Sequence, residues 1–142
     1  MPTRSNLTEF EELYLEFQRK VSAEWHKRMD SLVSGSQATI LWKLELSGPQ
    51  KASTLAAQMN VTPGAITSLS DKLISSGYAI RNRDLHDRRI VYLEITDQGR
   101  EVLKQFRIET KSIMEDFFTG ISEEDINHLI RIYQQVLLNI DK

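Results

Sequence analysis

Cysteine is absent from the 142-residue sequence, which excludes disulfides, thiolate metal sites and a cysteine-based redox switch. Long apolar runs are absent too, and none approaches the ~20 residues that a membrane span requires. The first twelve residues are polar and acidic, so we expect no secretory signal, no association with a membrane and a cytoplasmic location.

Signatures of metal binding and catalysis are also missing. The three histidines, His26, His86 and His128, lie far apart in the chain without ligand spacing, so we predict no metal site. No nucleophile–base–acid arrangement and no glycine-rich phosphate loop stands out. We therefore expect neither an enzyme nor a bound cofactor.

The composition is that of an ordinary globular protein, with 40% apolar and 27% charged residues, and the length suits one domain. The net charge of −2 is unevenly distributed. Residues 51–92 hold six basic and three acidic residues, whereas the rest of the chain holds 12 basic and 17 acidic residues. A positive central segment between acidic ends can present one face to phosphate groups.

Hydrophobic periodicity predicts a mainly helical chain with one hairpin. An amphipathic helix over residues 7–32 has an apolar stripe that needs a partner. We expect Ser36 to cap a helix over residues 37–46, which Pro49 then prevents from continuing. Beyond the central segment, Thr96 is expected to cap a helix running to about Thr119, and Ser122 a last helix.

The central segment contains two short helices joined by a tight turn. The first covers residues 51–59, and the second begins at Thr62 and Pro63 and stops at Ser76-Gly77. This spacing indicates a helix-turn-helix, whose second helix enters the DNA major groove with its N-terminal residues toward the bases. The residues expected to face DNA are small, hydroxylic or basic: Thr62, Pro63, Gly64, Ala65, Thr67, Ser68 and Lys72. Capping alone explains Thr62 equally well.

A β-hairpin is predicted next, because β-branched residues alternate over residues 78–83 and 90–95 around a polar tip. Asp84 and Asp87 are placed to hold a guanidinium in one fork geometry. Arginine at such a tip can enter the narrow minor groove, and four arginines lie on or beside it: Arg81, Arg83, Arg88 and Arg89. The alternative is a solvated hairpin whose charges pair only with one another.

These residues together resemble the MarR (multiple-antibiotic-resistance regulator) family of winged helix-turn-helix transcription regulators. The most specific matches are Asp87-Arg88-Arg89 at the wing tip and Leu93-Glu94-Ile95-Thr96-Asp97-Gln98-Gly99 behind it. Further matches are Lys51–Ala56, Val61–Thr67, Asp71-Lys72-Leu73 and Ser76-Gly77-Tyr78.

The resemblance implies a mainly α fold with a small β-hairpin wing, built as one domain over residues 1–142. A winged helix-turn-helix DNA-binding lobe would occupy residues 34–96, and dimerisation helices would occupy residues 1–33 and 97–142. Such proteins bind pseudo-palindromic operators in double-stranded DNA as homodimers, usually as repressors. The alternative function is a winged-helix protein-interaction module that does not bind DNA.

Many members of the family release DNA when a small aromatic or phenolic effector binds between the dimer helices and the DNA-binding lobe. By analogy, the candidate lining residues are Trp25, His26, Met29 and Trp42. Packing in the core or at a dimer interface is the commoner reason for aromatic residues at helical spacing, so this assignment rests on the resemblance alone.

Overall fold

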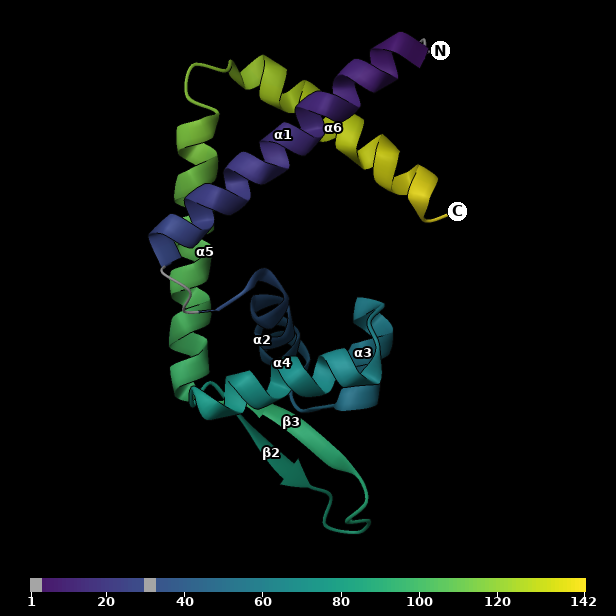
Figure 1. Cartoon of the computed structure of the whole chain (residues 1–142), viewed down its shortest axis with the longest axis vertical. Coiled ribbons are helices and arrows are strands. Elements are labelled where there is room, and N and C mark those ends of the chain that lie inside the picture. Colours follow the sequence, from purple (N-terminus) through teal and green to yellow (C-terminus); the bar gives the residue numbers. More distant parts are fainter. Residues whose placement is uncertain (1–3, 30–32) are drawn as a thin grey trace. The chain divides into compact units, whose positions relative to one another are not determined.

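The computed structural model describes residues 4–29 and 33–142 of the chain (Figure 1). Its described residues form six helices and three short strands: α1 (Arg4–Met29), α2 (Gly35–Ser47), β1 (Gln50–Lys51), α3 (Ala52–Met59), α4 (Pro63–Ser75), β2 (Ala79–Arg83), β3 (Val91–Ile95), α5 (Asp97–Phe117) and α6 (Glu123–Ile140). The chain divides into two compact units, Met1–Thr110 and Lys111–Lys142. The predicted mainly helical fold with a hairpin wing is confirmed.

The first unit contains the helix-turn-helix, formed by α3 and α4. Asn60 ends α3 in the left-handed conformation, with φ of 59°, and its N–H donates to the carbonyl oxygens of Ala56 and Ala57. Thr62 then caps α4, because its side chain accepts a hydrogen bond from the N–H of Ala65, and Pro63 takes the first helical position. The turn and the cap both agree with the sequence prediction.

The cap of α2 differs from the prediction, because Ser34 caps the helix and not Ser36. The side chain of Ser34 accepts from the N–H of Gln37 at 3.1 Å, and the N–H of Ser34 donates to Oε1 of Gln37 at 2.8 Å. This reciprocal pair requires the glutamine three residues after the cap, a spacing that Ser36 does not have. The helix consequently begins at Gly35, two residues earlier than expected.

The ends of the long helices also differ slightly from the prediction. The helix expected over residues 7–32 is α1, which begins at Arg4, and residues 30–32 lie outside the described residues. The helix that follows Thr96 ends at Phe117, two residues before the predicted end. Ser122 caps α6 as predicted, since its side chain accepts from the N–H of Asp125 at 3.1 Å.

The sheet has the strand order β1-β3-β2, with both pairings antiparallel. β2 and β3 form the predicted wing, which extends as a hairpin beyond the helices of its unit (Figure 1). The two-residue β1 was not predicted; it pairs Gln50 with Leu93 and Lys51 with Tyr92. It ties the start of the helix-turn-helix to the wing.

The base of the wing is joined to the start of α5 through Thr96. Its N–H donates to the carbonyl oxygen of Tyr78 at 3.1 Å, and its hydroxyl donates to that of Gly77 at 2.6 Å. The same hydroxyl accepts from the N–H of Gly99 at 3.0 Å, which confirms the predicted cap. A Cβ added at Gly99 would lie 2.1 Å from the carbonyl oxygen of Tyr78, so only glycine allows this close approach.

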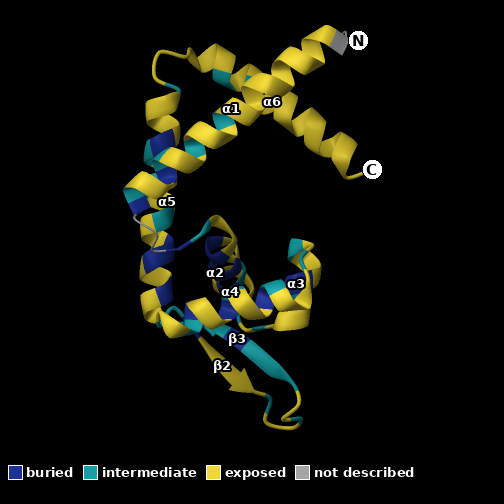
Figure 2. Ribbon diagram, viewed as in Figure 1, coloured by how far each residue is buried: buried dark blue, intermediate teal, exposed yellow. Residues whose placement is uncertain are grey.

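A hydrophobic core fills the first unit behind α4 (Figure 2). Helices and strands from the whole unit contribute side chains that are at most 5% exposed, among them Ile40, Leu41, Leu44, Leu55, Ile66, Leu73, Leu93 and Ile95. This core fixes the position of α4 relative to the wing.

Candidate nucleic-acid interface

The N-terminal end of α4 presents the side chains that the sequence places toward DNA. Ala65 is half-buried, and the other six predicted residues are exposed: Thr62, Pro63, Gly64, Thr67, Ser68 and Lys72. A Cβ at Gly64 would have no neighbour closer than the Thr62 hydroxyl at 4.0 Å, so this surface is open. Small residues at the end of an exposed helix permit a backbone to approach bases closely.

Two hydroxyl groups at this end of α4 have different hydrogen-bonding capacities. The Thr62 oxygen accepts from the N–H of Ala65 at 3.1 Å, which leaves its proton available to donate to a phosphate. Thr67 instead donates its proton to the carbonyl oxygen of Pro63 at 3.0 Å. Its oxygen therefore retains acceptor capacity, which suits a base amino group.

The tip of the wing is shaped by Asp84. One oxygen of its carboxylate accepts from the N–H groups of His86, at 3.0 Å, and Asp87, at 2.9 Å. The backbone of Ile90 closes the turn, because its carbonyl accepts from the N–H of Asp84 and its N–H donates to Asp87. The prediction that Asp84 holds a guanidinium is therefore wrong, since its carboxylate is used by the turn.

Asp87 does hold a guanidinium, as predicted, and its partner is Arg89. Nε and Nη2 of Arg89 donate to the two carboxylate oxygens, each at 3.0 Å, and the N–H of Arg89 adds a third bond to Oδ1. The side-chain hydrogen bonds from Arg89, and then its backbone N–H, lower the pKa of Asp87 below 3.8, while Asp87 raises the pKa of Arg89. This fork fixes the direction of one arginine at the tip.

The other wing arginines have different environments. Arg83 donates from Nη1 to the carbonyl oxygen of Arg88 at 2.7 Å, so it supports the backbone of the tip. Arg88 has an exposed side chain with no hydrogen-bond partner within residues 4–29 and 33–142. Arg81 forms an ion pair with Asp71 of α4. Arg88 is thus the wing arginine most available to a ligand.

Two features next to this interface were not predicted from the sequence. The first is the contact between Asp71 and Arg81, which the Ser76-Gly77 turn between α4 and β2 brings together. The second is Ser70, which is 3% exposed and whose hydroxyl has no hydrogen-bond partner in the described part of the chain. Ser70, Thr67, Arg81 and Tyr92 belong to the lining of a hollow of about 400 Å³ between α4 and the wing.

The four candidate effector-binding residues do not line one hollow. His26 lines a hollow of about 460 Å³ behind α4, together with Gln37, Asp71, Lys72 and others. Trp42, 44% exposed, lines a separate hollow of about 250 Å³ between α2 and α5.

Trp25 and Met29 are core side chains, exposed by 8% and 2%. The Trp25 ring packs edge-on against Phe106, with centroids 4.7 Å apart, and against His26, with centroids 5.6 Å apart. Burial in the core accounts for Met29 without a ligand, whereas the indole N–H of Trp25 is buried with no hydrogen-bond partner among the described residues. His26 is accessible from its hollow.

Within the described ranges, 4–29 and 33–142, neither a metal site nor a membrane span is found. No group of three or more histidine or acidic side chains in the described residues could hold a metal ion. None of the helices in that part of the chain is long and apolar enough to cross a bilayer.

Comparison with known proteins identifies the family. The sequence profile of the MarR family matches residues 33–91. An uncharacterized HTH-type transcriptional regulator of Bacillus subtilis, YkoM, is 34% identical over 123 residues, which cover 83% of this chain and 79% of the relative. The HTH-type transcriptional repressor MdtR of the same organism is 28% identical over 109 residues, 76% of this chain and 70% of the repressor.

Solved structures agree with the sequence matches. The crystal structure of the YusO protein from Bacillus subtilis superimposes with a TM-score of 0.78 and 25% identity, covering 96% of this chain and 99% of that one. The named relatives are transcriptional regulators and not enzymes. With a winged helix-turn-helix and a relative 34% identical over most of its length, the chain belongs to the MarR family of transcriptional regulators.

Proposed function

We propose that this regulator represses transcription by binding a pseudo-palindromic operator as a homodimer, with α4 in the major groove and the wing tip in the minor groove. The observation that carries the proposal is the exposed Arg88 on a tip whose backbone is fixed by Asp84 and Arg83. A preformed tip loses little conformational entropy when it binds, and arginine is favoured where the minor groove is narrow. Family membership supports DNA binding as such.

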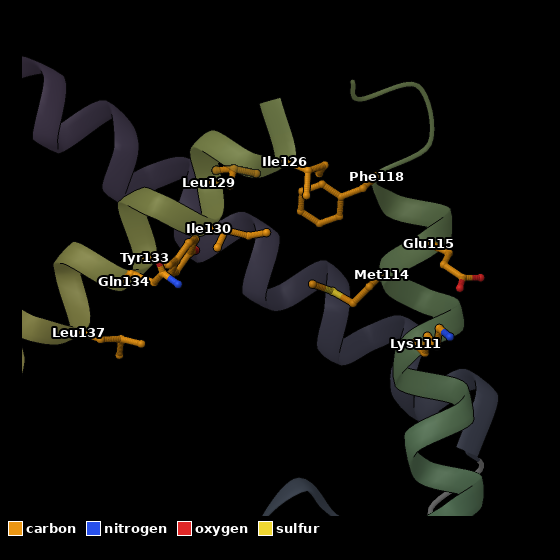
Figure 3. Close-up of a pocket in the computed structure, with 10 residues that line it drawn as sticks. All are labelled: Lys111, Met114, Glu115, Phe118, Ile126, Leu129, Ile130, Tyr133, Gln134 and Leu137. Carbon is orange, nitrogen blue, oxygen red and sulfur yellow. The ribbon is translucent and has the colours of Figure 1, made fainter. Parts of the chain in front are cut away.

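The second unit supports the homodimer. Every described residue of α6 is at least partly exposed, and its large apolar side chains include Ile130, Tyr133, Leu137, Leu138 and Ile140, exposed by 48% to 68% (Figure 2). Three of these side chains, Ile130, Tyr133 and Leu137, line an apolar hollow of about 590 Å³ (Figure 3). Met114 of α5 and Phe118, just after that helix, line it from the other side. A soluble monomer rarely exposes such a continuous apolar surface, and a second copy would bury it.

The hollow behind α4 supports an effector site. Its volume of about 460 Å³ lies within the range of small-molecule sites, and its lining combines Val33 and Leu69 with the polar groups of His26, Gln37 and Lys72. A small aromatic effector bound there would contact α4, the proposed recognition helix, directly. If the effector bound the DNA-free protein more tightly than the DNA-bound protein, it would lower the affinity of the protein for DNA.

The DNA-binding proposal is tested by exchanging Arg88 and Arg89 together for alanine. Operator affinity, measured by fluorescence anisotropy on a duplex selected from random DNA, should fall at least tenfold and depend less steeply on salt concentration. The matched control is R19A/K20A, which removes an adjacent pair of exposed basic residues from α1. Equal affinities for all three proteins would instead favour a winged-helix protein-interaction module.

The dimer is tested by Leu137→Asp, which places a charge on the exposed apolar face of α6. Sedimentation should then show a monomer at concentrations where the unaltered chain is a dimer. Asn139→Asp introduces the same charge on a polar position of the same helix and should leave the dimer intact. Footprinting of the dimer should protect two half-sites about 10 base pairs apart, and one isolated half-site would contradict the proposed geometry.

A further inference from the structure

An ion pair crosses the candidate interface between the recognition helix and the wing. Asp71 on α4 contacts Nη2 of Arg81 on β2, and the two side chains remain 56% and 45% exposed. Ion pairs with this exposure contribute little to folding stability, because water screens the attraction and both side chains lose freedom. The effect of the pair therefore lies in the charge that it presents at the surface.

Asp71 differs in role from the other two acidic residues of the central segment. Asp84 accepts backbone N–H groups of the tip, and Asp87 orients Arg89 within the same turn. Asp71 belongs to neither turn and reaches the wing from α4. It neutralises an arginine that would otherwise add a positive charge between the recognition helix and the wing tip.

We propose that Asp71 competes with DNA phosphate for Arg81 and so limits the affinity of this regulator for DNA. Carboxylate and phosphate oxygens accept from a guanidinium with the same fork geometry, so one can replace the other. When DNA binds, Arg81 exchanges the carboxylate for a phosphate, so the ion pair with Asp71 has to be broken first. The competition lowers affinity for every duplex, specific or not, because phosphate contacts carry no sequence information. This role rests on the DNA binding proposed above.

The test is Asp71→Asn in the 142-residue chain, measured on a selected duplex and on a duplex of unrelated sequence. We expect about two- to fivefold tighter binding to both, the size of one exposed ion pair. The log–log slope of the salt dependence should change by much less than the ~0.9 that a gained phosphate contact would give, since Arg81 neutralises one phosphate in both proteins. The melting temperature should be unchanged.

The matched control is Glu45→Gln. Glu45 of α2 pairs with Arg100 of α5 at 2.9 Å, and those side chains are 39% and 48% exposed. Arg100 also contacts Asp97 at 2.7 Å, and both contacts lie outside the wing and α4. This variant makes the same change in net charge and should leave DNA affinity within experimental error. In an Arg81→Ala background, Asp71→Asn should no longer raise the affinity.

Two results would overturn the proposal. Weaker binding by Asp71→Asn would mean that Asp71 positions Arg81 on DNA and does not compete for it. A gain that persists in the Arg81→Ala background would mean that Asp71 repels DNA directly. If the unaltered chain selected no duplex from random DNA, DNA binding itself would be contradicted. This failure is distinguishable, because the other two results require that the unaltered chain binds its selected duplex.

Discussion

Gly99 provides a sharp test of how the wing is joined to the rest of its unit. In a Gly99→Ala variant, the new Cβ would lie 2.1 Å from the carbonyl oxygen of Tyr78 and 2.8 Å from Cγ1 of Ile95. The first contact cannot be relieved by rotating a side chain, because it involves the backbone of Tyr78. The first turn of α5 must therefore move away from the base of β2 by about 1 Å.

That movement has a calculable cost. It strains the bonds from Thr96 to the carbonyl oxygens of Tyr78, at 3.1 Å, and Gly77, at 2.6 Å. Two weakened hydrogen bonds cost about 1 kcal/mol each, and overpacking of a tight contact adds about 1–3 kcal/mol. Since alanine recovers up to about 1 kcal/mol of helix propensity, we expect a net loss of about 2–4 kcal/mol.

Thermal and urea denaturation followed by circular dichroism would measure this loss. For a chain of this length it corresponds to a fall in Tm of roughly 6–16 °C. Gly35→Ala is the control, because Gly35 also lies in a first helical turn but has no atom within 4 Å of the added Cβ. Equal Tm values for the two variants would refute the argument from close approach.

Three further predictions concern the interface and its caps. Gly64→Ala should fold normally, since its added Cβ would meet nothing closer than 4.0 Å. It should nevertheless bind DNA at least fivefold more weakly in a gel-shift assay, because the added methyl group separates α4 from the bases. Ser34→Ala should lower the free energy of unfolding by about 1 kcal/mol, whereas Ser36→Ala should leave it unchanged, as urea titration can decide. Because the pKa of Asp87 is lowered in the folded protein, its pairing with Arg89 stabilises the folded tip above pH 3.8. This stabilisation is lost as the pH falls through the pKa of the folded state, and an NMR titration of the Asp87 carboxyl carbon should give a midpoint below 3.8.

Local chemistry made much of this fold predictable from sequence. The Asn60 turn, the Thr62-Pro63 start of α4 and the alternation in the hairpin each act over a few residues, and each agrees with the structure. The capping box of α2 could also have been predicted, because Gln37 stands three residues after Ser34, but the prediction placed the cap on Ser36. The two-residue strand β1 is too short to show a sequence pattern, and its pairing with β3 depends on the tertiary fold.

The candidate site was only partly predictable. Residue types and spacing suggested which side chains face outward on α4 and which lie on the wing. They could not assign Asp84 to the turn and Asp87 to Arg89, because both acids are close to several donors in sequence. Nor could they separate His26 from Trp25, adjacent residues of one helix, of which His26 lines a hollow and Trp25 packs into the core.

The hydrogen bonds of Thr96 also affect how the chain folds. The bond from its hydroxyl to Gly77 spans 19 residues, which include the whole hairpin, so it forms only when the hairpin has closed. Closing a loop of this length costs modest entropy, but the same hydroxyl also caps α5. The wing and the first turn of α5 should therefore open and close as one cooperative unit, with matching hydrogen-exchange protection at Leu93 and Gly99. The wing would then resist local unfolding as strongly as the first turn of α5 does.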